Sequence, residues 1–206
     1  MSSVSDVLVA CVLAVLLIVG GYQVYFLPQR WPLRAPRRLL LALDDKIPFW
    51  PQWVWAYSLL YYPFILSIIP TIRDFRHYAY TAANFAILLL TQVVIAYALP
   101  VKTPKRWRRY ERGQSLSTKF LGFVQSVDSG GNCFPSMHIA VASLAALHIA
   151  NNMSDYGPLI PVLVVLTVFL IFLSALFTKQ HYLLDVPAGL MLGIAIYSIH
   201  PLLYRV

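Results

Sequence analysis

The sequence predicts an all-α integral membrane protein, a bundle of six transmembrane helices in a single domain. Hydrophobic residues make up 59% of its 206 residues, a share well above that of a soluble globular domain. Uncharged apolar runs of about 20 residues, the length that crosses a bilayer as a helix, recur along the chain. These runs occupy most of residues 1–206, so we expect no separate soluble domain.

The predicted spans are six apolar segments, which in chain order are residues 7–27, 53–72, 78–99, 134–151, 159–177 and 187–203. The fourth and the sixth are at the short end of what crosses a bilayer. The first is predicted to be a retained helix and not a secretory signal. Its leading segment contains Asp6 and no positive charge, whereas the start of a signal peptide is basic.

Two long connections join these spans. Residues 102–133 form the longest, and a connection of that length in a compact bundle is usually functional. We therefore expect it to form part of an active-site mouth. The connection at residues 28–52 contains the letters RRLLLALDDKIPFW, which predict a short amphipathic segment at the membrane interface. A salt bridge from Asp44 or Asp45 to the basic 102–133 connection is one interpretation, but a solvated face of this segment is the preferred one.

The net charge of +8 is concentrated on one side of the predicted bundle. If the spans alternate in direction, the connections after the first, third and fifth hold all the basic residues except Arg73, Arg76 and Arg205. The positive-inside tendency makes that side cytoplasmic, but a phosphate-binding function would explain the same charge. Both termini are predicted on the opposite side. Nucleic acid is excluded as a partner, because no basic domain is available to lie along a duplex.

Two histidines stand at the beginnings of two predicted spans that run in the same direction. Gly130, Gly131 and Pro135 lead into the fourth span. There Ser136 is suited to cap the helix or donate to a bound oxygen, and His138 follows at once. Because a helix N-terminus presents unpaired N–H groups and a partial positive charge, it is a ready anion site.

His181 and Asp185 precede the sixth span and are four residues apart, which places them on one helix face. A carboxylate at that spacing holds an imidazole in one tautomer. The surrounding cations predict a pocket for a phosphate or diphosphate whose tail remains in the bilayer. They are Lys102, Lys105, Arg106, Arg108, Arg109 and Lys179. For Arg108 itself, however, a topology or anionic-lipid signal is the preferred interpretation.

These motifs resemble those of the type-2 phosphatidic acid phosphatase superfamily. Its P-S-x-H core stands at residues 135–138, and its H-x-x-x-D ending stands at residues 181–185. Its K-x6-R-P signature is partly met by Lys102 and Arg109, with Tyr110 in place of the proline. Ala175 replaces an arginine of the third signature. That departure resembles the inositol phosphorylceramide synthase and sphingomyelin synthase branch, whose members transfer a phospho-headgroup to a lipid alcohol.

The resemblance implies a metal-independent reaction without a cofactor. His181 would attack phosphorus and become a phosphohistidine, Asp185 would orient it, and His138 would protonate the leaving oxygen and then activate the acceptor. The resemblance also implies a set of side chains that bind phosphate oxygens: Ser136, Lys102 and Arg109, with Lys179 or Arg106 replacing the arginine absent at Ala175.

The partners that follow are a lipid phosphate and membrane lipids; no oligomeric state is specified. Hydrolysis is the first choice, because the chain is short and lacks an obvious second acceptor pocket. Headgroup transfer to a ceramide-like lipid is the alternative, and a non-catalytic lipid-binding or transport bundle is a third interpretation. A zinc site of His138, His181 and Asp185 is conceivable, but the surrounding cations would repel a dication.

Overall fold

The computed structural model describes residues 4–111, 113–199 and 201, and this part of the chain is helical without a β-strand. The α-helices are α1 (Val4–Tyr25), α2 (Leu27–Arg30), α3 (Ala42–Lys46), α4 (Tyr61–Leu66), α5 (Phe75–Ala98), α6 (Leu116–Val127), α7 (Met137–Asn152), α8 (Leu159–Phe177) and α9 (Asp185–Tyr197). Short helical turns are η1 (Pro51–Trp53), η2 (Ala56–Leu60), η3 (Ile69–Thr71), η4 (Lys105–Arg108) and η5 (Ser154–Tyr156). The prediction of an all-α fold is confirmed.

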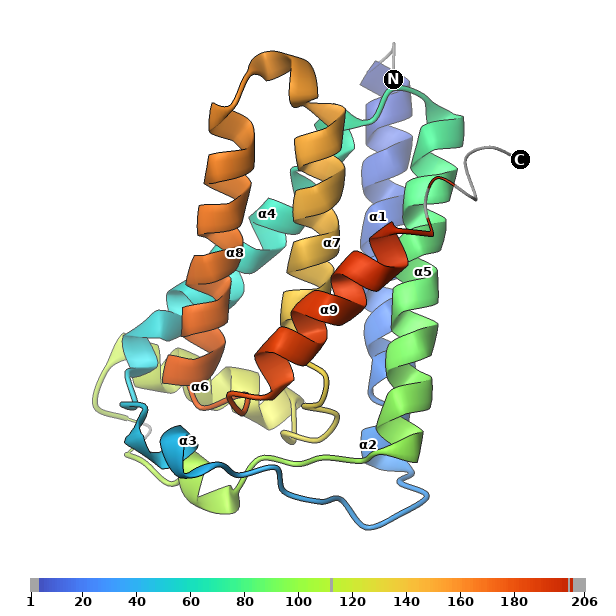
Figure 1. Cartoon of the computed structure of the whole chain (residues 1–206). Coiled ribbons are helices and arrows are strands. Elements are labelled where there is room, and N and C mark those ends of the chain that lie inside the picture. Colours follow the sequence, from blue (N-terminus) through green and yellow to red (C-terminus); the bar gives the residue numbers. More distant parts are fainter. Residues whose placement is uncertain (1–3, 112, 200, 202–206) are drawn as a thin grey trace.

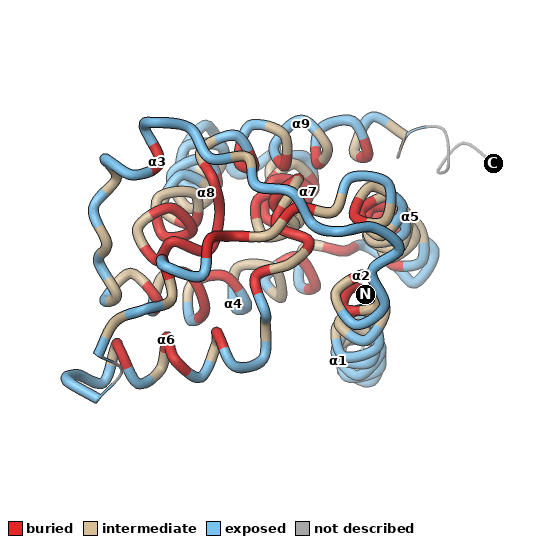
Figure 2. The backbone as a smooth tube through the Cα atoms, turned by 90° about the horizontal axis from the view of Figure 1, so that it is seen from below, coloured by how far each residue is buried: buried red, intermediate tan, exposed pale blue. Residues whose placement is uncertain are grey.

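The long helices run along a common direction with α7 among them (Figure 1). α7 packs against α8 and α9 and also against α4 and α5, and α9 crosses in front of it obliquely. The connecting segments with α3 and α6 gather at the end of the bundle where α7 and α9 begin (Figure 2). Residues 1–3 and 202–206, which hold the two termini, lie outside the described residues.

Four of the predicted spans are helical segments long and apolar enough to cross a membrane. They are Val4–Arg30, Pro51–Thr71, Phe75–Ala98 and Leu159–Phe177. The last has the bounds that the sequence predicts. The other two predicted spans contain α7 and α9, which are shorter, at 16 and 13 residues. The count of six crossings stays a prediction.

The second predicted span is not one continuous α-helix, as the sequence suggested, but a series of short helical pieces. Its residues form η1, the π-helical turn η2, α4 and η3. The physical reason is proline: Pro63 has no N–H to donate to a carbonyl in the preceding turn, and such a gap favours a local π turn. Tyr57 and Tyr61, four residues apart in this region, both contact the His138 ring.

α7 and α9 approach each other closely at two glycines of α9. A Cβ added to Gly189 would lie 2.4 Å from the backbone oxygen of Ser136, and one added to Gly193 would lie 2.6 Å from that of Ala140. Small residues four apart are what allow membrane helices to come into backbone contact. This contact fixes where α9 begins relative to the start of α7.

Replacing Gly193 with leucine should therefore separate the two helices. Forcing a larger side chain into a packed interface costs about 1–3 kcal/mol, so we expect a lower thermal transition temperature in detergent. Gly20 in α1 has no atom within 4 Å of an added Cβ, and Gly20→Leu is the matched control that should leave the transition in place. Equal transition temperatures for the two variants would contradict the close crossing.

The connections at the lower end of the bundle differ from their prediction. The expected amphipathic segment RRLLLALDDKIPFW forms a helix only over the five residues of α3, and the longer helix α6 lies in the connection 102–133. The solvated position expected for Asp44 is wrong: it is 1% exposed. Its carboxylate accepts from the backbone N–H groups of Leu183 (2.7 Å) and Leu41 (2.7 Å), which would otherwise lack a partner.

Candidate active site

The beginnings of α7 and α9 are joined directly through the main chain. The backbone N–H of Ser136 donates to the carbonyl of Asp185 at 2.9 Å. The Ser136 hydroxyl accepts from the N–H of Ile139 at 3.4 Å, so its predicted capping role is confirmed. With the two segments held in this way, the centroids of the His138 and His181 rings lie 6.2 Å apart. The spacing is short enough for both imidazoles to reach one phosphoryl group.

His181 has one ring nitrogen bonded to the protein. Its Nδ1 lies 3.0 Å from the Cys133 carbonyl oxygen and 3.3 Å from Oδ2 of Asp185. Both neighbours are acceptors, so Nδ1 carries the hydrogen in the neutral ring. The lone pair is then on Nε2, where a nucleophile needs it. The expected contact with Asp185 is present, although His181 lies in the turn before α9 and not on a face of that helix.

Asp185 is held beside His181 through one of its two carboxylate oxygens. It is fully buried, and the oxygen that contacts His181 also accepts from the backbone N–H of Tyr182 at 2.8 Å. Tyr182 is itself buried and donates its hydroxyl to the Lys102 carbonyl at 2.8 Å. The 102–133 connection is thereby tied to the turn that carries His181.

His138 lies against two tyrosines that the sequence did not single out. Its ring packs on Tyr57, with centroids 4.2 Å apart and an interplanar angle of 21°, and on Tyr61, with centroids 4.4 Å apart. The Tyr57 hydroxyl is 3.2 Å from Nδ1 of His138. The two tyrosines orient the imidazole between them. The available sequence signal was the four-residue spacing of Tyr57 and Tyr61, which places two side chains on one helix face, but nothing in it indicated His138 as the partner.

The structure does not bring all the predicted cations to the histidines. Nζ of Lys179 donates to the Asp44 carbonyl at 2.5 Å and lies 5.1 Å from the centre of a Trp107 ring; burial lowers the pKa of this lysine. Arg106 is exposed and forms an ion pair with Asp45 at 2.7 Å. The Lys179 side chain thus bonds to α3, and the Arg106 side chain lies on the surface.

Lys102 and Arg109 belong to the connection at the end of the bundle where α7 and α9 begin. Lys102 is half-buried and its backbone N–H donates to the Arg37 carbonyl at 3.0 Å. Arg109 is exposed and lines a surface pocket together with Arg38 and Arg106. Their predicted role in binding phosphate stays a prediction. In the described part of the chain no three His, Cys, Asp or Glu side chains cluster as metal ligands.

Arg108, preferred as a surface signal from the sequence, points into the protein. Its guanidinium donates to the backbone carbonyls of Asp128 (2.5 Å) and Gln125 (3.2 Å) and to Oε1 of Gln180 (3.3 Å). Gln180 directly precedes His181. The surface interpretation is therefore wrong for Arg108, and the arginine nearest in sequence to the predicted Arg109 is the one that reaches inward.

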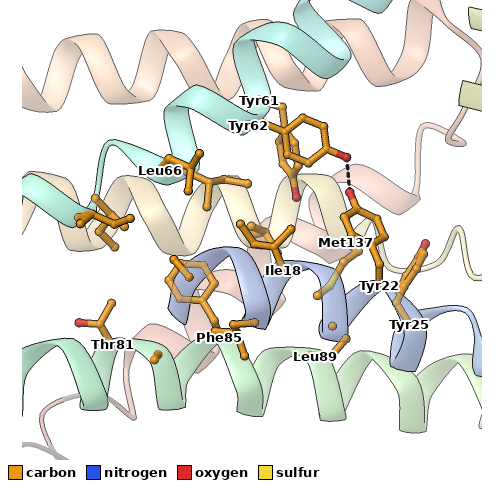
Figure 3. Close-up of a pocket in the computed structure, with 18 of the residues that line it drawn as sticks. Ile18, Tyr22, Tyr25, Tyr61, Tyr62, Leu66, Thr81, Phe85, Leu89 and Met137 are labelled. Atoms are coloured by element: carbon orange, nitrogen blue, oxygen red, sulfur yellow. Dashed lines mark hydrogen bonds between the residues drawn. The ribbon is translucent and has the colours of Figure 1, made fainter. Parts of the chain in front are cut away.

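An apolar groove lies within the bundle (Figure 3). It has a volume of about 150 Å³ and lies between α1, α4, α5 and α7, and Met137 and His138 are among its lining residues. Aliphatic and aromatic side chains form most of its wall, among them Ile18, Leu66 and Phe85. The hydroxyls of Tyr22 and Tyr62 are hydrogen-bonded to each other, which links α1 to α4 at this groove.

Comparison with protein families matches residues 22–199 to the PAP2 superfamily. The matched region contains His138, His181 and Asp185 and the residues that contact them. A search of curated proteins and a search of solved structures each found no match.

Proposed function

Because the chain belongs to the PAP2 superfamily, we propose that it is a membrane enzyme that hydrolyses a phosphomonoester or diphosphate of a lipid through a phosphohistidine at His181. Membership supports a phosphatase- or phosphotransferase-type function on lipid phosphates in general, and several long apolar helices support a membrane protein. The observation that carries the proposal is the pair of imidazoles 6.2 Å apart, one of them in contact with a buried carboxylate.

In the first step, Nε2 of His181 attacks phosphorus and the bond to the lipid oxygen breaks. The negative charge that develops on that oxygen is neutralised by a proton from His138. Asp185 and the Cys133 carbonyl hold the hydrogen on Nδ1 of His181, and they stabilise the positive charge that the ring acquires when it is phosphorylated.

In the second step, His138, now without its proton, accepts one from a water molecule. The water oxygen forms a bond to phosphorus, the bond to His181 breaks, and inorganic phosphate is released. Ser136 at the beginning of α7, together with Lys102 and Arg109, is proposed to bind the phosphoryl oxygens as the resemblance implies. Arg106 and Lys179 have other partners in this structure, so they are weaker choices to replace the arginine absent at Ala175.

The lipid nature of the substrate is supported by the apolar groove that His138 helps to line. A hydrocarbon chain in this groove would be removed from water while its phosphate reaches the imidazoles, and an apolar lining with few polar groups is typical of sites for such ligands. We propose that the chain of the lipid phosphate lies between α1, α4, α5 and α7.

Headgroup transfer to a ceramide-like lipid alcohol is the second candidate, favoured by the alanine at position 175. The two reactions share the first step and differ in the acceptor of the second. Purified protein is supplied with a radiolabelled phospho-headgroup donor and with a lipid phosphate, each with and without an acceptor lipid. Release of inorganic phosphate without acceptor supports hydrolysis. Product that forms only with acceptor would replace hydrolysis by transfer, and turnover of neither donor would support a non-catalytic bundle.

The proposed topology has six crossings, with the site at the basic side of the membrane. If α7 crosses the bilayer, α6 and η5 lie on opposite sides. We expect single cysteines introduced at exposed Ser126 and at exposed Ser154 to react with an impermeant reagent from opposite sides of sealed vesicles. The background is Cys11→Ala, since Cys133 is buried. The side from which the cysteine at position 126 reacts identifies the side that carries the site. Labelling of both cysteines from the same side would contradict a crossing by α7.

A further inference from the structure

Buried hydrogen-bond donors without partners occur in the segments that adjoin His181. Four side chains each have one such atom: Oγ1 of Thr103, Nε of Arg108, Nε2 of Gln125 and Nε2 of Gln180. Thr103 is 3% exposed, and Gln125 and Gln180 are each 5% exposed. A buried donor left without an acceptor costs about 1–3 kcal/mol. Native proteins have few such groups, so four of them in one region require an explanation.

Arg108 connects these residues: it lies with Thr103 over Gly130, bonds to the Gln180 side chain and bonds to the backbone of Gln125. Nη2 of Arg108 is 3.3 Å from Oε1 of Gln180, and Nη1 is 3.2 Å from the Gln125 carbonyl oxygen. A Cβ added to Gly130 would lie 2.4 Å from Nη2 of Arg108 and 2.5 Å from Oγ1 of Thr103. Gly130 has a φ of 77°, a conformation that favours glycine. The absence of a side chain at this position leaves the space that Arg108 and Thr103 occupy.

The acceptor atoms of the two glutamines are already used. Oε1 of Gln180 accepts from Arg108, and Oε1 of Gln125 accepts from the Tyr110 hydroxyl at 3.0 Å. Arg108 has no salt bridge to an acidic side chain of the described residues. The carboxylate of Asp128 accepts instead from Gln29 and from the N–H of Gly130. The Asp128 carboxylate interacts electrostatically with Arg108 but does not form an ion pair with it, and the unused donors complement a ligand whose oxygens only accept.

The segments that border this group also border the nucleophile. Gln180 directly precedes His181, and the backbone N–H groups of both donate to the carbonyl of Ala175 (3.0 and 3.3 Å). Gly130 lies three residues before Cys133, whose carbonyl contacts His181. Position 175, where the expected arginine is absent, is therefore next to the turn that carries Gln180.

We propose that Thr103, Arg108, Gln125 and Gln180 form an anion pocket that binds oxygens of a phosphate or diphosphate, with Arg108 supplying the charge that is absent at Ala175. That the anion is a lipid's phosphate rests on the proposed function. The binding of a phosphate anion as such does not, and it is tested separately.

The sharpest test exchanges a donor for an acceptor without changing shape. Gln125→Glu keeps an oxygen for the Tyr110 hydroxyl, and Gln180→Glu keeps one for Arg108, but each replaces the unused N–H group by a carboxylate oxygen that repels an anion. Binding of inorganic phosphate to the purified protein is measured by calorimetry. We expect each variant to raise the dissociation constant at least about tenfold, a loss of ~1.4 kcal/mol.

Gln52→Glu in η1 is the matched control, since Gln52 is exposed and undergoes the same change of charge. It should bind phosphate like the original chain. Arg108→Gln should also weaken binding. Because this change removes bonds to two backbone carbonyls, Gln125→Glu and Gln180→Glu decide the question if the Arg108 variant does not fold. In lipid phosphate hydrolysis, Gln125→Glu and Gln180→Glu should raise KM more than they lower kcat.

The outcomes separate the pocket from the proposed function. Phosphate affinity unchanged in both glutamate variants, or no phosphate binding by the original chain, overturns the pocket even if lipid phosphate is hydrolysed. Weakened phosphate binding in both variants, with no turnover of lipid phosphates by the original chain, supports the pocket and removes the phosphatase proposal. A purely structural role would raise the thermal transition of Gln180→Glu, through its new ion pair with Arg108, without changing phosphate affinity.

Discussion

Replacing His181 with glutamine is expected to abolish phosphate release from lipid phosphates. Glutamine preserves much of the volume and an N–H group for the Cys133 carbonyl, but it has no basic nitrogen to attack phosphorus. Loss of a covalent nucleophile costs roughly 10⁴-fold or more in turnover. Phosphate release is measured in detergent micelles, and an unchanged thermal transition shows that the fold is retained.

The same experiment detects the proposed intermediate. Protein stopped with base shortly after addition of a ³²P-labelled substrate should carry label in the original chain and none in His181→Gln. His77→Gln is the control, because His77 lies at the start of α5, away from the site, and should retain both label and turnover. If His181→Gln hydrolysed lipid phosphates as fast as the original chain, His181 would not be the nucleophile.

Replacing His138 with asparagine is expected to slow the reaction by roughly 10²–10⁴-fold, the usual contribution of a general acid or base. The size of the effect should depend on the leaving group. An alkoxide leaving from a lipid phosphate needs a proton, whereas p-nitrophenolate leaves without one. With p-nitrophenyl phosphate, the variant should therefore retain the first step and fail at the second.

The consequence is a burst of p-nitrophenol followed by slow turnover, while protein phosphorylated at His181 accumulates. Tyr57→Phe serves as the companion variant: it keeps the ring that packs on His138 but removes the hydroxyl 3.2 Å from Nδ1, and a much smaller decrease is expected. If His138→Asn slowed both substrates equally and gave no burst, His138 would have no role in proton transfer.

Much of the fold and the core of the site could be predicted from the sequence because they depend on local signals. The bounds of α8 follow from an unbroken apolar run, and the cap at Ser136 follows from a turn-rich segment before another such run. The contact of His181 with Asp185 follows from their four-residue spacing. These features need only neighbouring residues, so a pattern is sufficient to find them.

Features that depend on distant parts of the chain could not be predicted in the same way. Arg108 and Arg109 are adjacent and chemically identical; which of them points inward is decided by η4 and by the space over Gly130. Asp44 is buried because two backbone N–H groups, one of them far along the chain at Leu183, need an acceptor. Lys179 has a φ of 56°, and its side chain reaches Asp44 instead of the histidines.

The bond between the N–H of Ser136 and the carbonyl of Asp185 joins main chain to main chain. Substitutions in the walls of the groove leave that bond untouched, so mutations can accumulate there without disturbing how the two imidazoles face each other. Descendants of one ancestral gene can in this way exchange one lipid for another, or water for an alcohol, while inheriting the same reaction chemistry.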